Sequence, residues 1–385
     1  MMSIKEELEI LRGEPIGVFI GDAMDIPCID TFDKEKICKH PLVSVHMMAY
    51  NHELYIRQAI EGVVMQETDF EFELVIGEDC SQDKTREICF EYQKKYPDKI
   101  RVLWWHENVS KFGGNDRRVT ARCRGDFIAF CEGDDYWTDS LKLQKQVDVM
   151  RKHQSVGLCF GIAEITEMNG TRTVPWDGSA FPTGFMDGKH FFGLNCFGRA
   201  DRKWAGSEWF LMTQTVMIRK SVFDSACDKY EVLSWGLCMG DVTQWLGVSS
   251  LSDAYYIPQV LAVYRRTSSG VCTINGLNVI RDAILVRFYY SMVVVGLSYE
   301  SALKYWKDHL TISWINHLKS CAVREKILKS LRVLRSSSLR NLFLRPVGLL
   351  PFILSLVGIL NRVTAYLPIR LVMKFHKNIG WPDFK

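Results

Sequence analysis

Two adjacent aspartates, Asp134 and Asp135, closely follow Phe127–Phe130, a short apolar segment typical of a buried strand. Two acids at the rim of a buried sheet repel each other unless a cation lies between them. Carboxylate oxygens suit Mg²⁺ or Mn²⁺, which complete their shells with water and phosphate oxygens. The pair therefore predicts a divalent metal site facing a diphosphate, where the ion neutralises a leaving phosphate. Alternatively, these acids cap a helix that begins near Ser140.

Polar residues also end two other segments that have the pattern of strands. Residues 49–52 follow the strand-like run 42–48, and residues 77–81 follow a second run at 72–76. Ligands of open α/β sheets bind beyond the carboxyl ends of the strands, so three strand ends would supply one cleft. The alternative is that the Asn, Asp and Gly at these points only make turns.

The elements that must position these residues alternate along the chain. Apolar periodicity predicts strands at 42–48, 72–76, 100–104 and 127–130, with helices at 56–64, 84–95 and 116–124 between them. Such alternation indicates parallel strands joined by crossover helices, which is an open α/β sheet. The chain contains no P-loop and no G-x-G-x-x-G, so any nucleotide must be held in another way.

Three segments in this order resemble the family 2 glycosyltransferases of bacterial polysaccharide biosynthesis, which have the GT-A fold. They are V-S-V-x-M-x-x-Y-N (43–51), E-L-V-I-G-E-D-C-S (73–81) and G-D-F-I-A-F-C-E-G-D-D-Y-W (125–137). The resemblance covers residues 41–270. It implies a mostly parallel nucleotide-binding sheet flanked by helices, a nucleoside-diphosphate sugar as donor, a divalent metal (Mg²⁺ or Mn²⁺), and inversion at the anomeric carbon.

The resemblance also implies roles for individual residues in binding the donor. Tyr50 packs on the base, and Asp79 accepts a hydrogen bond from the ring N–H of the base, which favours uridine or thymidine. Asp134 approaches the ribose and phosphates, and Asp135 is the metal ligand. The family often places a cation against the diphosphate, which is Arg117 or Arg118 here; the spacing does not decide between them, and both could lie on a solvated helix face.

An inverting transfer also needs a base to take the proton of the acceptor hydroxyl, and a carboxylate within hydrogen-bond reach is sufficient. The candidate is Asp241, because the family has a Gly-Asp or Glu-Asp that opens a helix at this distance after the metal motif. Asp241 could equally be the N-cap of that helix. The two roles are compatible.

Two departures from the family pattern affect the predicted site. Cys80 and Gln82 replace the usual Gly and Thr of the nucleotide motif. Thr267 stands where many relatives carry a His that contacts the metal or diphosphate, and Arg265 or Arg266 is a candidate to replace it.

The chain of 385 residues is long enough for two or three folding units. We expect an N-terminal extension at 1–40, the catalytic unit at 41–270, and a helical, basic C-terminal region at 271–385. No apolar signal segment opens the sequence, so the 12 Cys are expected in a reducing cytosol rather than in disulfides. No C-x-x-C or H-E-x-x-H is present, which argues against a zinc site.

The C-terminal region has a local excess of positive charge. Ten Lys or Arg and no acid lie between 326 and 382, and the uncharged run 346–360 is shorter than the ~20 residues that a spanning helix needs. This pattern favours a segment lying on an anionic membrane, at its cytoplasmic face. A buried helix with a basic exposed face, or a nucleic-acid patch, is the alternative; sparse aromatic residues argue against nucleic acid.

The sequence therefore predicts an inverting, metal-dependent glycosyltransferase that acts on a glycan or polyprenyl-linked acceptor in surface polysaccharide synthesis. Two other functions stay open. A sugar nucleotidyltransferase shares the sheet but would want a Gly-rich basic loop, which residues 45–51 do not offer. A nucleotide-sugar-binding scaffold at the membrane would share the site without catalysis.

Overall fold

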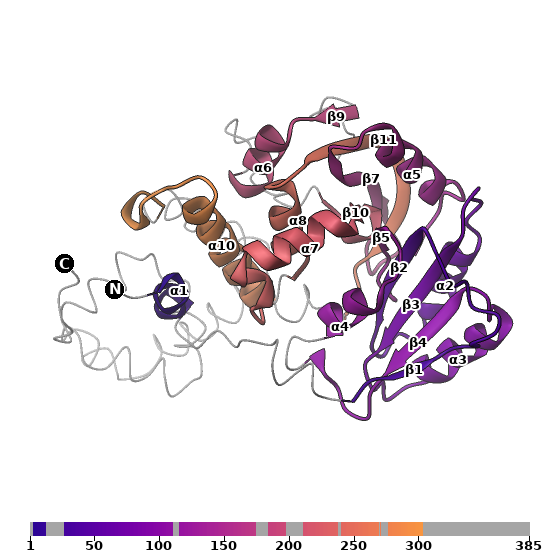
Figure 1. The fold of residues 1–385 in the computed structure, drawn as a ribbon. Helices are drawn as coiled ribbons and strands as arrows, with labels where there is room; N and C mark the ends of the chain where they lie inside the picture. Colours follow the sequence, from indigo (N-terminus) through magenta and orange to yellow (C-terminus); the bar gives the residue numbers. More distant parts are fainter. Residues whose placement is uncertain are drawn as a thin grey trace, which may run out of the picture. The chain divides into compact units, whose positions relative to one another are not determined.

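The computed structural model describes residues 3–12, 27–110, 115–174, 184–197, 211–237, 240–268, 270 and 276–302 (Figure 1). The chain forms two compact units. The larger unit contains residues 16–198 and 209–279, and the smaller contains residues 1–15, 199–208 and 280–385. The candidate site lies in the larger unit.

The described strands form one mixed sheet in the order β1-β4-β3-β2-β5-β10-β7-β11-β6, with β8 beside β7 and β9 beside β11. Their bounds are β1 Ile29–Thr31, β2 Val43–Ala49, β3 Phe72–Glu78, β4 Ile100–Trp104, β5 Phe127–Phe130, β6 Tyr136–Trp137, β7 Val156–Thr166, β8 Arg172–Thr173, β9 Gly184–Met186, β10 Met217–Arg219 and β11 Asp253–Arg265.

The described α-helices are α1 Ile4–Arg12, α2 Ile56–Val64, α3 Thr85–Lys95, α4 Asn115–Arg122, α5 Lys142–Lys152, α6 Gly188–Phe197, α7 Lys220–Lys229, α8 Gly240–Ser249 and α10 Gly276–Val293. Two short 3₁₀ helices, η2 Thr213–Thr215 and η3 Glu231–Ser234, precede β10 and follow α7.

The four strands predicted from periodicity form the parallel part of the sheet. β2 pairs in parallel with both β3 and β5, and β3 pairs in parallel with β4. Their carboxyl ends therefore lie at one edge. β10 then pairs antiparallel with β5 and β7, and the last long pair, β7 with β11, is parallel again. The predicted open α/β sheet flanked by helices is confirmed.

Both faces of the parallel strands are buried, which explains their nearly continuous apolar sequences. Val43, Val45 and Met47 of β2 belong to a core that α2, α3 and α5 cover (Figure 1). The alternate residues Ser44 and His46 lie on the opposite face, where α4 packs on β2 and β3 and α8 packs on β7. Polar side chains on this second face must find partners there.

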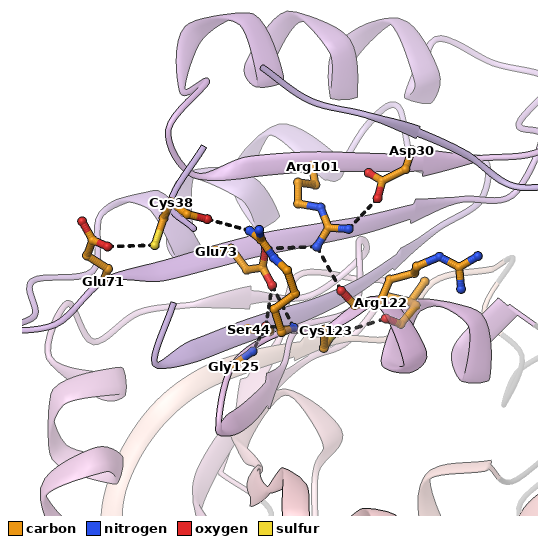
Figure 2. Close-up of polar contacts among 11 residues, drawn as sticks. Asp30, Cys38, Ser44, Glu71, Glu73, Arg101, Arg122, Cys123 and Gly125 are labelled. Atoms are coloured by element: carbon orange, nitrogen blue, oxygen red, sulfur yellow. Dashed lines mark hydrogen bonds and ion pairs between the residues drawn. The ribbon is translucent and has the colours of Figure 1, made fainter. Parts of the chain in front are cut away.

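One such group of partners is centred on Glu73 and surrounds the beginnings of the strands (Figure 2). Glu73 is fully buried, and it accepts hydrogen bonds from Ser44 Oγ (2.7 Å), Arg101 Nη1 (3.1 Å) and Arg124 Nε (3.0 Å). Arg101 also bonds to Asp30 of β1. Burial raises the pKa of Glu73, but the bonds from Arg124 and Ser44 outweigh burial and lower it overall. The Glu73 cluster thus joins β1 to the parallel strands.

The uncharged run 346–360 and its basic flanks, which are predicted to lie on a membrane, fall within residues 303–385, outside the described residues. Among the residues that the structure describes, no helix is both long and apolar enough to traverse a bilayer. The membrane association therefore stays a prediction.

Candidate functional site

The loops after β2 and β3 are tied together at the carboxyl edge of the sheet. Asn51 donates its backbone N–H to Ser81 Oγ (3.0 Å), and Gln82 donates its backbone N–H to Asn51 Oδ1 (2.8 Å). A third bond joins His52 N–H to Thr85 Oγ1 (2.7 Å). These reciprocal bonds fix the two loops against each other before any ligand arrives.

Two residues of these loops have left-handed backbone conformations. Asn51 has φ 55° and Cys80 has φ 60°. Asn adopts this region with modest strain, whereas Cys does not. The Gly that relatives carry at the position of Cys80 is therefore explained by the backbone, and this chain keeps the same turn at a cost in strain.

Asp79 lies at the end of β3 and is fully buried. Its carboxylate accepts backbone N–H groups from Val109 (2.7 Å) and Ser110 (2.9 Å), so it holds the loop that follows β4. Each carboxylate oxygen retains a further lone pair. Tyr50, the predicted partner of the base, is 41% exposed at the neighbouring loop. The structure therefore places both residues at the edge that the sequence predicts.

Asp134 and Asp135 form a turn that Arg265 clamps. Arg265 donates its backbone N–H to Asp135 Oδ1 (2.8 Å) and its guanidinium to Asp134 O (2.6 Å), and its guanidinium lies 4.2 Å from the Tyr136 ring centroid. Asp135 is 2% exposed, while Asp134 is partly exposed. Burial, and then the charge of Asp134, raise the pKa of Asp135 well above its usual value.

The donor set fits a hard divalent cation. Within the described ranges, no three His, Cys, Asp or Glu side chains converge in a metal-binding group. The protein thus offers the two neighbouring carboxylates of Asp134 and Asp135, with one oxygen of Asp135 already accepting from Arg265. Mg²⁺ and Mn²⁺ accept one or two carboxylates and complete their shells with water and substrate phosphates.

The two candidate cations of α4 have different surroundings. Arg117 donates to Leu233 O (2.7 Å), so it is engaged by η3. Arg118 is 3% exposed and lies 5.6 Å from the Trp105 ring centroid, and among the described residues none of its three guanidinium nitrogens has an acceptor. Burial lowers the pKa of Arg118, which the nearby Asp79 charge partly opposes. Of these two arginines, Arg118 is thus the one whose guanidinium has no anionic partner in the described part of the chain.

A further group of acids gathers where β5 and α8 approach. Asp241, in the first turn of α8, accepts from Thr213 Oγ1 (2.9 Å). Burial raises the pKa of Glu132 to about 8, and the charges of Asp134, Asp116 and Asp241 add to this effect. The pKa of Glu132 therefore responds both to Asp134 of the predicted metal site and to Asp241, the predicted base.

A family model described as glycosyl transferase family 2 matches residues 44–226, which include β2 to β5, α4 and the Asp134–Asp135 turn. Residues 44–226 of the chain therefore belong to glycosyl transferase family 2, as the sequence motifs predict. An uncharacterized protein of Mycobacterium tuberculosis is 30% identical over 230 residues, which are 60% of this chain and 60% of that relative. The dTDP-rhamnosyl transferase RfbG of Shigella flexneri is 30% identical over 110 residues, 27% of this chain and 36% of its own length.

Staphylococcus aureus TarS, a poly(ribitol-phosphate) β-N-acetylglucosaminyltransferase, is 36% identical over 97 residues, 24% of this chain and 16% of its own length. Its solved structure (residues 1–349, with UDP-GlcNAc) matches this family 2 chain with a TM-score of 0.52 and 16% identity, over 84% of this chain and 81% of that one. The likeness confirms the GT-A fold predicted from the sequence motifs.

Sequence reasoning missed three polar residues of this family 2 site. Glu132 was overlooked although it is an acid two positions before Asp134, and His46 although it interrupts an apolar strand. Asp116 lies in α4 and accepts from His46. Of the two arginines at the end of β11, Arg265 lies at the acidic turn, whereas Arg266 pairs with Glu167 (3.1 Å).

Proposed function

We propose that this family 2 chain transfers a sugar from a uridine or thymidine diphosphate sugar to a glycan or lipid-linked glycan, with inversion at the anomeric carbon. The observation that carries the proposal is Arg118, a buried guanidinium for which the residues that the structure describes supply no acceptor. Burying an unpaired charge costs several kcal/mol, on the order of 3–5. A donor diphosphate at this sheet edge would supply the missing anion, whereas a neutral ligand would not.

The proposed reaction is a single displacement. The acceptor oxygen forms a bond to the anomeric carbon while the bond from that carbon to the diphosphate breaks, and the hydroxyl proton moves to the Asp241 carboxylate. The bond from Thr213 orients this carboxylate, and the N-terminus of α8 favours negative charge there. Arg118 would stabilise the leaving diphosphate.

Asp135, with Asp134 beside it, would hold Mg²⁺ or Mn²⁺. When bound, the ion supplies positive charge to the departing diphosphate. In this chain, Arg265 keeps the two acids turned together, and it stands in place of the His that relatives carry at Thr267.

Three features support the donor and acceptor classes. The predicted contact of Asp79 with a ring N–H suits uracil or thymine. RfbG is named for a thymidine diphosphate sugar, and TarS was solved with a uridine one. TarS is also named for a poly(ribitol-phosphate) acceptor, which supports a polymeric acceptor here. The polyprenyl-linked form of that acceptor rests on the predicted membrane association alone.

The first arm of the test measures UDP binding with Mn²⁺ present. Arg118→Met is expected to weaken UDP binding at least 10-fold, because it removes the buried cation. Arg117→Met is the matched control, since it removes the same side chain from the next position of α4, where Leu233 O and not a ligand engages it. Equal losses in both variants would contradict the assigned role of Arg118.

The second arm measures turnover with UDP-, dTDP- and GDP-sugars. Asp241→Asn is expected to lower kcat by about 10²–10⁴ while UDP binding persists, because only proton removal is lost. Asp224→Asn, an identical change at an exposed residue paired with Lys220, is the control. Asp135→Asn is expected to abolish the effect of Mn²⁺ on binding. A wild-type chain that neither transfers nor hydrolyses any sugar nucleotide would overturn the proposed function.

A further inference from the structure

One carboxylate joins the helix that carries Arg118 to the helix that carries Asp241. Asp116 lies in the first turn of α4. Its Oδ1 lies 3.2 Å from His46 Nε2 of β2, and its backbone oxygen lies at the same distance from that nitrogen. Its Oδ2 accepts a hydrogen bond from Gln244 Nε2 of α8. Three elements that are distant in sequence therefore meet at a single side chain.

The three partners are buried to different degrees. His46 is fully buried, Gln244 is 2% exposed, and the Asp116 side chain is 25% exposed. Burial lowers the pKa of His46, but the bond and the charge of Asp116 outweigh burial and raise it overall. Polar groups in such a place are costly unless they bond to one another. Loss of any one partner therefore changes where the other two lie.

The position of Asp116 beside α8 bears directly on Asp241. Gln244 follows Asp241 by three residues, so the two lie on neighbouring positions of one helix face. A Cβ atom on Gly240, the residue before Asp241, would lie 3.5 Å from Asp116 Oδ2. The charge of Asp116 also acts on Glu132, together with that of Asp241. The first turn of α8 therefore begins against Asp116.

We propose that Asp116 is a positioning residue for sugar transfer. Held by His46, it holds the first turn of α8 through Gln244, and so it sets the place of the Asp241 carboxylate relative to a diphosphate bound beside Arg118. This inference rests on the proposed function. Donor binding depends on groups that Asp116 does not hold, whereas the base depends on α8, so disturbing Asp116 changes the chemical step and leaves donor affinity in place.

The test uses a pair of substitutions that break and then restore the bond. Asp116→Leu removes the acceptor that faces Gln244, and Gln244→Glu sets two carboxylates together. The double variant Asp116→Asn/Gln244→Glu has one donor, one acceptor and the original net charge. Misplacement of a reacting group by about 1 Å costs roughly 10²-fold. Each single variant is expected to lower kcat by about 10- to 100-fold with KM for the donor within about 2-fold, and the double variant to recover most of the loss.

Hydrogen exchange of the α8 backbone amides gives a second measurement that does not depend on activity. Exchange is expected to accelerate in both single variants and to return toward the wild-type rate in the double variant. Asp30→Asn is the matched control, because the Asp30 side chain is also 25% exposed and also pairs with a buried cationic partner, Arg101 of the Glu73 cluster. It should lower stability without altering kcat or α8 exchange.

The outcomes separate the inference from the proposed function. Unchanged α8 exchange in Asp116→Leu, or an unchanged kcat in that variant, overturns the inference while leaving the function standing. Failure of the double variant to recover activity also overturns it, because a merely disturbed fold would not be rescued by reversing the bond. An inactive wild type overturns the proposed function itself, and the positioning role falls with it.

Discussion

At the scale of single residues, neighbouring carboxylates of one sheet edge have different surroundings and therefore different chemistry. Asp79 is buried and accepts two backbone N–H groups. Asp135 is buried against Arg265, and burial raises the pKa of Glu132 to about 8. Residue type and spacing locate such acids, but they do not give these partners. The hydrogen-bonding partners of Asp79 and Asp135 come from loops and strands thirty or more residues away in sequence.

The left-handed turn at Cys80 gives a prediction about stability. A non-glycine residue in this conformation costs about 1–2 kcal/mol of strain, which a glycine would relieve. Glycine in turn costs about 0.5–1 kcal/mol, because it loses more chain entropy on folding. We expect Cys80→Gly to raise the free energy of unfolding by about 0.5 kcal/mol in urea denaturation. Cys80→Ala loses the same thiol but keeps the strain, so it should not stabilise. A less stable glycine variant would contradict the strain argument.

At the scale of elements, the sequence predicts the strands of the parallel sheet well and their neighbours poorly. The expected strand at 100–104 is β4, and that at 127–130 is β5. Their apolar runs are local signals. By contrast, β10 has only three residues and lies between β5 and β7, which no local pattern indicates. The choice between Arg117 and Arg118 likewise depends on the rotation of α4, which the sequence does not specify.

The turn that carries the acids requires a glycine. A Cβ on Gly133 would lie 2.7 Å from His52 Nδ1 and 2.8 Å from Met48 O. We expect Gly133→Ala to lower the free energy of unfolding by about 1–3 kcal/mol and to weaken Mn²⁺-dependent UDP binding, because the turn must shift. Gly193→Ala in α6 is the control. No atom of the described residues packed around it lies within 4 Å of a Cβ built on Gly193, so alanine should be neutral or stabilising there. Titration calorimetry and urea unfolding check both.

At the scale of the whole molecule, a lysine amine lies among the side chains of the core. Lys142 is fully buried, its Nζ lies 4.0 Å from the Trp137 ring centroid, and it donates to Gln146 Oε1 (2.8 Å). Burial lowers the pKa of Lys142 to about 7. The sequence indicates a helix that begins near Ser140 but not the burial of this residue, because lysine is rarely fully buried.

The depressed pKa of Lys142 gives a pH dependence of global stability. Between pH 7 and about 10 the unfolded chain keeps a proton that the folded chain has lost, so this group makes stability rise with pH by up to ~1.4 kcal/mol per unit. Below pH 7 the penalty is complete. Lys142→Met should therefore stabilise the protein at pH 7, on the order of 2 kcal/mol, and its advantage over wild type should shrink toward pH 10.

Urea unfolding of both chains at several pH values measures this difference, which cancels the titration of other groups. Lys145→Met in the same helix is the control, since Lys145 is partly exposed and pairs with Asp139 (2.6 Å). A difference between wild type and Lys142→Met that stays constant with pH would show that the lysine does not titrate as its burial requires.

β1 matters for the choice of the N-terminus in truncated variants of this protein. The motifs suggest that the catalytic unit starts at residue 41, yet residues 29–31 pair with residues 102–104 and Asp30 bonds to Arg101. Removing them would strip hydrogen-bonding partners from β4 and turn it into an open border strand that invites a second molecule to pair with it. Solubility would then depend on where the chain is cut, and a truncated chain that precipitates would say nothing about the competence of the residues proposed to bind the nucleotide.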